Sequence, residues 1–299
     1  MTGSALAGRT STAGTTGMRG TSGAAVLRRK RRLSRLLTGI LIAVLFLAPV
    51  LYVVMIAFET PTHFLTSPMT PPSSAHLSNF SQGWTGADLA TELVNTVIYS
   101  VVASAVSTVL ALLIAYPLGR RLVRGHGALY ALLAAGLFLP LAIIPLFIEA
   151  RILHLYDNMP GYIILHIEPG LPLGVVLLTA FVLAIPVELD EAAWLDGTSY
   201  LGYLGRVIVP LIRPALLITF LYGMLGVWND IIGPVVLLGA TSTNLFPITR
   251  GIYTFYGQNE SAYTVFAAAV VIASLPLVLL FAGTQRQLVR AAIAGSVKG

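Results

Sequence analysis

The sequence has no cysteine, and lysine accounts for only two of its 18 basic residues. The lack of cysteine excludes a disulfide framework, a thiol nucleophile and a cysteine-based metal site. Charge is also scarce: 10% of the 299 residues are charged, and 56% are hydrophobic, whereas a soluble domain carries roughly 25% charged residues. A soluble fold could not hide this much apolar surface, so the composition indicates a polytopic membrane protein.

Six long apolar stretches can each supply the roughly 20 residues that a helix needs to cross a bilayer. These stretches cover residues 36–58, 93–118, 128–148, 161–186, 207–230 and 264–284. We therefore expect an all-α integral membrane protein with six transmembrane helices. An outer loop over 59–92 would separate the first helix from a transmembrane core over 93–285. Four prolines in that loop predict irregular or partly extended structure.

The basic residues give the orientation. With the N-terminus inside, all of them lie in inner segments except Arg151 and Arg250. This positive-inside asymmetry predicts that both termini are cytoplasmic. Residues 1–35 would be a disordered basic tail and 286–299 a C-terminal tail. The run 36–58 is too long for a signal-peptide core, which predicts a retained anchor.

Motifs for catalysis or nucleotide binding are missing. A P-loop needs a lysine after glycine, but Lys30 follows arginine and Lys298 lies near the C-terminal end, so this chain does not hydrolyse ATP alone. No HExxH or GxSxG motif is present. The five scattered histidines do not form a metal-binding pattern, so we expect no metal site. Most of the basic charge lies beside apolar runs, which argues against nucleic-acid binding.

The segment after the fourth apolar stretch reads as a short cytoplasmic helix over about 186–200. Pro186 suits a first helical position, and three acids follow in the first turn, where they favour the helix dipole. Gly197 suits a left-handed C-terminal cap. Such a helix could be a handle for a cytoplasmic partner, or an ordinary interfacial helix between two spans.

The spacing of residues in this segment resembles a known family. Glu191-Ala192-Ala193, three residues, Gly197, nine residues and Val207-x-Val209-Pro210 are similar to the EAA motif of ABC importer permeases, usually EAA-x3-G-x9-I-x-LP. Asn95, Trp228-Asn229-Asp230 and the tail from Gln285 to Gly299 further resemble the maltose-type carbohydrate permeases. The resemblance covers roughly 60–299, although Ala291-Ala292 replace the usual glycine of the tail.

The resemblance implies a type I ABC importer permease fold and no enzymatic activity. The partners would be a second homologous permease subunit, an ATPase dimer carrying ATP and Mg²⁺, an extracytoplasmic solute-binding protein and membrane lipid. No cofactor would be bound by this chain. The residues implied in coupling to the ATPase are Glu191, Ala192, Ala193, Asp196, Gly197 and Pro210. The tail residues implied in the same contact are Arg286, Arg290 and Lys298.

Polar residues within the apolar stretches predict a solute pathway, because an ionisable group in a span is costly and by default functional. Glu168 lies inside the fourth stretch, where Pro169, Gly170 and Pro172 would interrupt the helix. A vestibule suited to a sugar would be lined by Asn95, His166, Glu168, Trp228, Asn229 and Asp230. Structural roles stay open for three of them: Trp228 at the membrane interface, Glu168 paired with Arg151, and Asn95 bonded to a neighbouring helix.

Two other functions compete with an ATP-driven sugar importer. An ion-coupled secondary transporter often shows inverted repeats, and no repeat is visible in the sequence. A membrane-embedded enzyme needs a reactive cluster, and none is visible either. The solute remains open among disaccharides, oligosaccharides, polyols and sugar phosphates.

Overall fold

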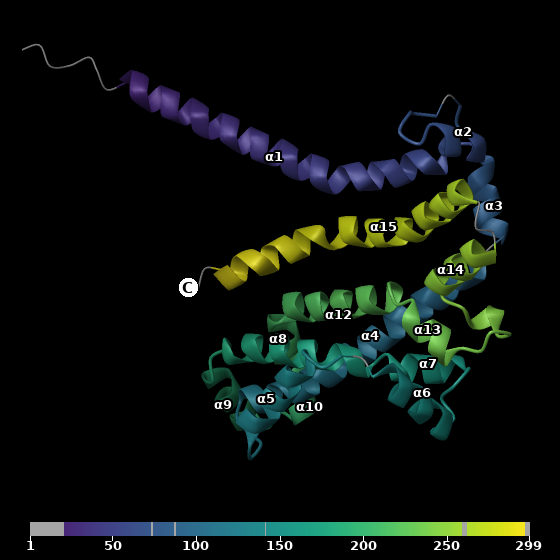
Figure 1. Cartoon of the computed structure of the whole chain (residues 1–299). Helices are drawn as coiled ribbons and strands as arrows, with labels where there is room; N and C mark the ends of the chain where they lie inside the picture. Colours follow the sequence, from purple (N-terminus) through teal and green to yellow (C-terminus); the bar gives the residue numbers. More distant parts are fainter. Residues whose placement is uncertain (1–20, 73, 87, 141, 259–261, 297–299) are drawn as a thin grey trace, which may run out of the picture. The chain divides into compact units, whose positions relative to one another are not determined.

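The computed structural model describes residues 21–72, 74–86, 88–140, 142–258 and 262–296, and every regular element in them is helical (Figure 1). This confirms the all-α prediction. Four helices are long and apolar enough to cross a membrane: Ser34–Ala57, Leu89–Gly119, Met159–Leu183 and Tyr263–Gln285. A bent pair of helices, Tyr200–Leu211 and Arg213–Trp228, passes the same test when its two parts are taken together, and it counts as a fifth candidate if the pair is one span.

Helix α1 (Thr21–Ala57) contains the first predicted span. It begins well before residue 36, so the predicted end of the tail at residue 35 is not a structural boundary. The leucines, arginines and lysine of 27–37 are good helix formers, which explains the longer helix. Among the described residues, those up to Val53 form one compact unit and those from Val54 onward form a second.

The first outer loop is more regular than the sequence predicted. It contains α2 (Pro61–Thr66) and α3 (Ser78–Gly86). Pro61 occupies the start of α2, where a missing N–H costs nothing, and the Thr60 hydroxyl accepts the His63 amide at 3.2 Å as an N-terminal cap. The prediction of irregular structure was wrong here because this proline starts a helix.

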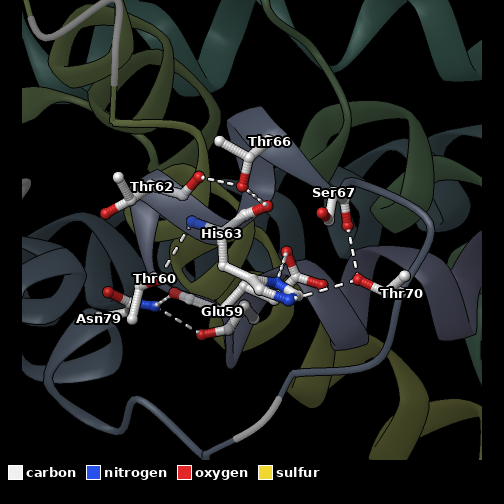
Figure 2. Close-up of polar contacts among 9 residues, drawn as sticks. Glu59, Thr60, Thr62, His63, Thr66, Ser67, Thr70 and Asn79 are labelled. Atoms are coloured by element: carbon white, nitrogen blue, oxygen red, sulfur yellow. Dashed lines mark hydrogen bonds and ion pairs between the residues drawn. The ribbon is translucent and has the colours of Figure 1, made fainter.

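A buried polar cluster ties the two ends of this loop together (Figure 2). The Asn79 amide on α3 donates to the carbonyl oxygens of Ala57 at 3.0 Å and Glu59 at 2.8 Å. Glu59 is fully buried, and its carboxylate lies 3.6 Å from Nδ1 of His63. The Nε2 atom of His63 lies 3.3 Å from the Thr70 hydroxyl. Asn79 therefore joins α3 to the last residue of α1 and to Glu59 just beyond it.

Asn79→Ala is expected to lower the thermal stability of the outer loop. The change leaves two buried carbonyl groups without their donors, and each unsatisfied group costs about 1–3 kcal/mol. Limited proteolysis of the purified protein should cut the segment 59–88 faster in the variant. Ser81→Ala is the matched control, since the Ser81 hydroxyl bonds only within its own helix, to Ser78. Equal cleavage rates in the variant and the wild type would contradict this role.

The centre of the second unit is α4 (Leu89–Gly119), which packs against α8 (Leu171–Leu183) and α12 (Arg213–Trp228). Small side chains make the close approach of these helices possible. A Cβ added at Gly174 of α8 would lie 2.9 Å from the Ala111 Cβ and 3.0 Å from a methyl carbon of Thr219. The three helices thus pack nearly backbone to backbone at this level.

The third predicted span, 128–148, is not one helix. The chain forms α5 (His126–Gly136) and, after a break, α6 (Ile143–Ile152). Pro140 lies in the break and Pro145 lies in the first turn of α6. Proline disfavours helix in the residue before it and removes a helix donor, so the two pieces are separate.

The fourth predicted span changes helix type where its prolines lie. α7 (Met159–Leu165) is followed by a single 3-10 turn, η1 (Glu168–Gly170), and then by α8. The predicted interruption at Pro169 and Gly170 is therefore confirmed. Glu168 is the first residue of this 3-10 turn and does not lie on a continuous α-helix.

The fifth predicted span, 207–230, is not one straight helix. The sequence 200–211 forms α10 (Tyr200–Tyr203), the π-helical η2 (Leu204–Ile208) and α11 (Val209–Leu211). An 87° bend then separates this segment from α12. Pro214 lies in the first turn of α12 and lacks the donor that would continue the earlier helix.

The remaining elements follow in chain order. α9 (Glu188–Leu195) is the short helix between α8 and α10. After α12 come α13 (Ile232–Leu237), η3 (Thr243–Leu245), α14 (Ile248–Gln258) and α15 (Tyr263–Ser296). α15 contacts α3, α12 and α14.

Candidate functional site

Helix α9 is the predicted coupling helix, with slightly different bounds. It begins at Glu188, two residues after Pro186, and its last helical residue is Leu195. Gly197 follows with φ +66°, the left-handed conformation that the sequence predicted for its C-terminal cap. Nothing lies within 4 Å of a Cβ added at Gly197, so backbone conformation rather than space favours glycine there.

The motif residues of α9 divide between two faces. Glu191 and Ala192 are exposed, as are Asp196 and Gly197 just beyond the helix. Ala193 is buried, and it belongs to a hydrophobic cluster that contains Ile185. The exposed motif face is therefore available to a partner, while the opposite face is fixed to the protein.

Two large apolar side chains next to the motif are also exposed. Trp194 is 72% exposed and Leu195 is 89% exposed. They border an open hollow of about 820 Å³, which α4 and the residues after it also line. Apolar groups with this exposure at a helix end are typical of a contact surface.

Pro210, the last motif residue, lies away from this exposed face. It is the middle residue of α11, two residues before the bend at Ile212. The motif therefore covers both the short helix α9 and the elbow that leads into α12.

Sequence reasoning missed Asp190 and Arg120. The Asp190 carboxylate is 2.6 Å from Nε of Arg120, and the hydroxyl groups of Tyr116 and Tyr203 donate to it. Asp190 was counted as a first-turn acid of α9. Its spacing to buried Ala193, i to i+3 on one helix face, is the signal that could have placed it inward.

The predicted solute pathway is partly assembled around His166 and Asp230. Nε2 of His166 lies 2.9 Å from Oδ2 of Asp230, and Nδ1 lies 2.8 Å from the Tyr162 carbonyl oxygen. Both ring nitrogens thus have a hydrogen-bond partner, which fixes the orientation of the ring. Asp230 also accepts the amides of Ile232 at 3.1 Å and Gly233 at 3.0 Å, which fixes the start of α13.

This ion pair lines a pocket of about 300 Å³. Ser104 and Ser107 from α4 and Tyr222 and Gly226 from α12 also line it. The sequence analysis did not identify these four. The two serines lie three residues apart on one face of α4, which was the available signal.

Glu168 lines a neighbouring hollow of about 530 Å³, together with Glu149 and Tyr222. Tyr222 borders both spaces, so the two hollows are adjacent. Among the described residues no ion pair joins Glu168 to Arg151. The Arg151 guanidinium lies over the Tyr156 ring instead, 5.0 Å from its centroid.

The other three predicted pathway residues line neither hollow. The Asn95 amide donates to the carbonyl oxygens of Asn244 at 2.8 Å and Phe246 at 3.1 Å, which holds the start of a second predicted outer loop, about 240–262, on α4. Trp228 is buried, and the exposed Asn229 donates back to Leu225 at 2.8 Å.

Arg250 is a second anchor of that outer loop. Its buried guanidinium donates to the carbonyl oxygens of Pro234 and, at 2.7 Å, Leu238, and lies 3.9 Å from the centroid of the Phe246 ring. Burial lowers the pKa of Arg250 below its usual range, although a guanidinium stays charged at any physiological pH. The cation therefore satisfies carbonyl groups at the end of α13.

The three predicted tail contacts are Arg286, Arg290 and Lys298. Arg286 and Arg290 lie in the C-terminal part of α15, so the helix continues through the segment predicted as a tail from residue 286. Lys298 lies outside the described residues. Among the described residues no group of three His, Cys, Asp or Glu side chains could hold a metal ion.

No family model matches the chain, but curated proteins do. It is 30% identical over 262 residues to the diacetylchitobiose uptake system permease protein NgcG of Streptomyces coelicolor, covering 86% of this chain and 84% of NgcG. It is 27% identical over 262 residues to AmyC of Thermoanaerobacterium thermosulfurigenes, a probable permease protein for starch degradation products, covering 87% of this chain and 94% of AmyC. The trehalose transport system permease protein SugB of Mycobacterium tuberculosis is 28% identical over 255 residues, covering 85% of this chain and 93% of SugB.

The fold has a solved counterpart. A chain of a bacterial ABC transporter involved in the import of the acidic polysaccharide alginate superposes with a TM-score of 0.75 at 23% identity, covering 91% of this chain and 99% of that one. This likeness supports the permease fold predicted from the EAA spacing. With 30% identity to NgcG over most of both chains, the protein belongs to the family of carbohydrate ABC transporter permease proteins.

Proposed function

We propose that this chain is a transmembrane subunit of an ATP-driven importer that translocates a sugar or sugar-like solute. It is a non-catalytic permease; a separate ATPase dimer binds ATP and Mg²⁺. A second permease subunit completes the pathway, and an extracytoplasmic binding protein delivers the solute. The relatives named above are permease proteins for sugars, and they give the ion-coupled alternative no support.

The observation that carries the coupling role is the two-faced helix α9. One face is packed into the protein through Ala193, and the other presents Glu191 and Ala192 outward. A helix anchored on one side and free on the other can transmit a displacement from a partner that grips the free side. The distribution of basic residues supports a cytoplasmic position for this helix and for both termini, in the plasma membrane of a bacterium.

The pocket lined by α4, α12 and α13 suits an uncharged solute that carries many hydroxyl groups. Its lining combines the His166–Asp230 pair with two serine hydroxyl groups and the Tyr222 ring. Hydroxyl-rich molecules bind through this mixture of charged hydrogen-bond partners and aromatic surface. The sister subunit would close the open side, so the full solute site needs both chains.

A cross-linking experiment tests the coupling role. Because the chain has no native cysteine, one introduced cysteine gives an unambiguous position. Ala192→Cys is expected to cross-link to an ATP-hydrolysing subunit in intact cells, because Ala192 is exposed. Ala193→Cys is the matched control, because Ala193 is buried and should react weakly. Failure of Ala192→Cys to capture any ATPase would overturn the proposal.

Glu168→Ala is expected to reduce uptake while assembly and basal ATP hydrolysis survive. Glu168 lines a hollow next to the His166–Asp230 pocket, so its loss changes the path of the solute and not the contact with the ATPase. The variant would lose a hydrogen bond between the Glu168 carboxylate and the solute. A hydrogen bond to a charged group contributes about 1.5–3 kcal/mol, so uptake should fall by at least about tenfold. Unchanged transport kinetics would remove Glu168 from the pathway.

A further inference from the structure

Asp190 joins three parts of the protein. It lies on α9 and is 9% exposed. Arg120, directly after α4, lies 2.6 Å from its Oδ2 atom, and Tyr116 of α4 donates to Oδ1 at 3.4 Å. Tyr203 of α10 donates to the same Oδ1 atom. One carboxylate therefore links the coupling helix to the end of α4 and to the start of the elbow before α12.

Arg120 strengthens this link from the other side. Its NH1 atom donates to the carbonyl oxygen of Ile185 at 2.9 Å, in the connection between α8 and α9. Only 7% of the Arg120 side chain and 12% of the Asp190 side chain are exposed. Buried ion pairs are often no more stabilising than apolar side chains of equal volume, so stability alone does not explain the choice of charges. Their directional contacts do fix how α9 is oriented on α4.

Helix α4, which Asp190 reaches through Tyr116 and Arg120, forms one wall of the pocket, and α12 forms another. Ser104 and Ser107 of the pocket lie on α4, and Gly223 and Gly226 lie on α12. α4 and α12 pack directly against each other. A movement of α9 that Asp190 passes to α4 would thus reach the pocket, and α12 beside it, without crossing a loop.

We propose that Asp190 is a positioning residue for energy coupling: with Arg120 and Tyr203 it makes α9 move as one body with α4 and with the elbow into α12. Without this link, the connections on either side of α9 would absorb the displacement that the ATPase imposes. The inference rests on the proposed function and adds a defined mechanical route to it.

The test measures how accessible the pocket is to a labelling reagent, and it does not require the solute to be known. Gly226→Cys places a single cysteine in the pocket, where an added Cβ meets nothing within 4 Å. In the assembled complex, its alkylation by a charged maleimide is measured without nucleotide and after trapping with ATP and vanadate. With native Asp190, the labelling rate should change by about tenfold between the two states. With Asp190→Asn, ATP hydrolysis should continue while this change falls below about twofold.

Two tyrosines of α10 provide a matched pair. The Tyr200 and Tyr203 rings both pack on Tyr116, with centroids 5.6 and 5.9 Å away, but the Tyr203 hydroxyl alone of these two bonds to Asp190. Tyr203→Phe should reduce the nucleotide-dependent change in labelling, and Tyr200→Phe should leave it intact. Arg120→Lys, which keeps the positive charge opposite Asp190, should retain part of the nucleotide-dependent change in labelling.

The outcomes separate this inference from the proposed function. If labelling with native Asp190 does not respond to ATP, or no ATPase copurifies, the proposed function fails. If the native protein responds and Asp190→Asn responds equally, the positioning role alone is overturned. If Asp190→Asn and Tyr203→Phe both fail to assemble, the contacts serve folding and the positioning role is again overturned.

Discussion

Leu195→Asp is expected to separate the chain from its ATPase without unfolding it. The Leu195 side chain is 89% exposed at the end of the coupling helix, beside the exposed Trp194. We expect Leu195 to be a hot spot of the interface, and loss of a hot-spot side chain costs at least about 2 kcal/mol, or roughly 30-fold in Kd. A carboxylate at this position would also have to be desolvated against the partner, which adds to the loss.

The affinity of the purified permease pair for the ATPase subunit measures this effect. Leu153→Asp is the control, because Leu153 is 54% exposed and follows α6, far along the chain from the coupling helix. Both variants should keep the thermal stability of the wild type. ATPase binding should weaken in the Leu195 variant alone. Equal affinity for the Leu195 variant and the wild type would show that the apolar end of α9 does not enter the interface.

The coupling segment could be predicted from the sequence because its signals are local. Acids in the first turn, an apolar face and a left-handed glycine define a short helix within a dozen residues. The structure places the helix over Glu188–Leu195, inside the predicted 186–200 and shorter at both ends. The motif spacing also identified Pro210 as a motif residue, but it did not predict the 87° bend that follows Leu211. Apolar composition looks the same on both sides of such a bend.

The third span illustrates the opposite case. Residues 128–148 are uniformly apolar, and hydrophobicity alone gives no reason to divide them. The prolines at 140 and 145 carried the information, but proline is tolerated in membrane helices when neighbouring helices satisfy the freed carbonyl groups. Whether such a stretch continues or breaks therefore depends on tertiary packing.

The candidate site was predictable only in part because it brings distant segments together. His166 and Asp230 are 64 residues apart in the sequence and pair at 2.9 Å. Their polarity identified them, but nothing local indicated which polar residues would meet. Asn95, chosen for the same reason, instead holds a loop about 150 residues away in the chain. A polar residue within a span is predicted to have a structural or functional role, but which residue it contacts depends on the tertiary fold.

Asp230→Asn is expected to reduce uptake by at least about tenfold while the protein still folds. The amide oxygen of asparagine can still accept the Ile232 and Gly233 amides, so the start of α13 is kept. The charge opposite His166 is lost, however, and a hydrogen bond to a charged group contributes about 1.5–3 kcal/mol. The Asp230 side chain is 23% exposed, so the effect on stability belongs at the lower end of this range.

Asp230→Ala separates the two roles of the carboxylate. It removes both the charge and the acceptor for the α13 amides, so it should lose uptake and should be about 1 kcal/mol less stable than Asp230→Asn. Asp88→Asn is the matched control, because Asp88 is an exposed acid with φ +46° and asparagine tolerates this conformation well. The measurements are ATP-dependent solute uptake into proteoliposomes and the melting temperature of each variant. If Asp230→Asn transports like the wild type, the charge of this pair has no part in translocation, and only the capping of α13 explains the aspartate.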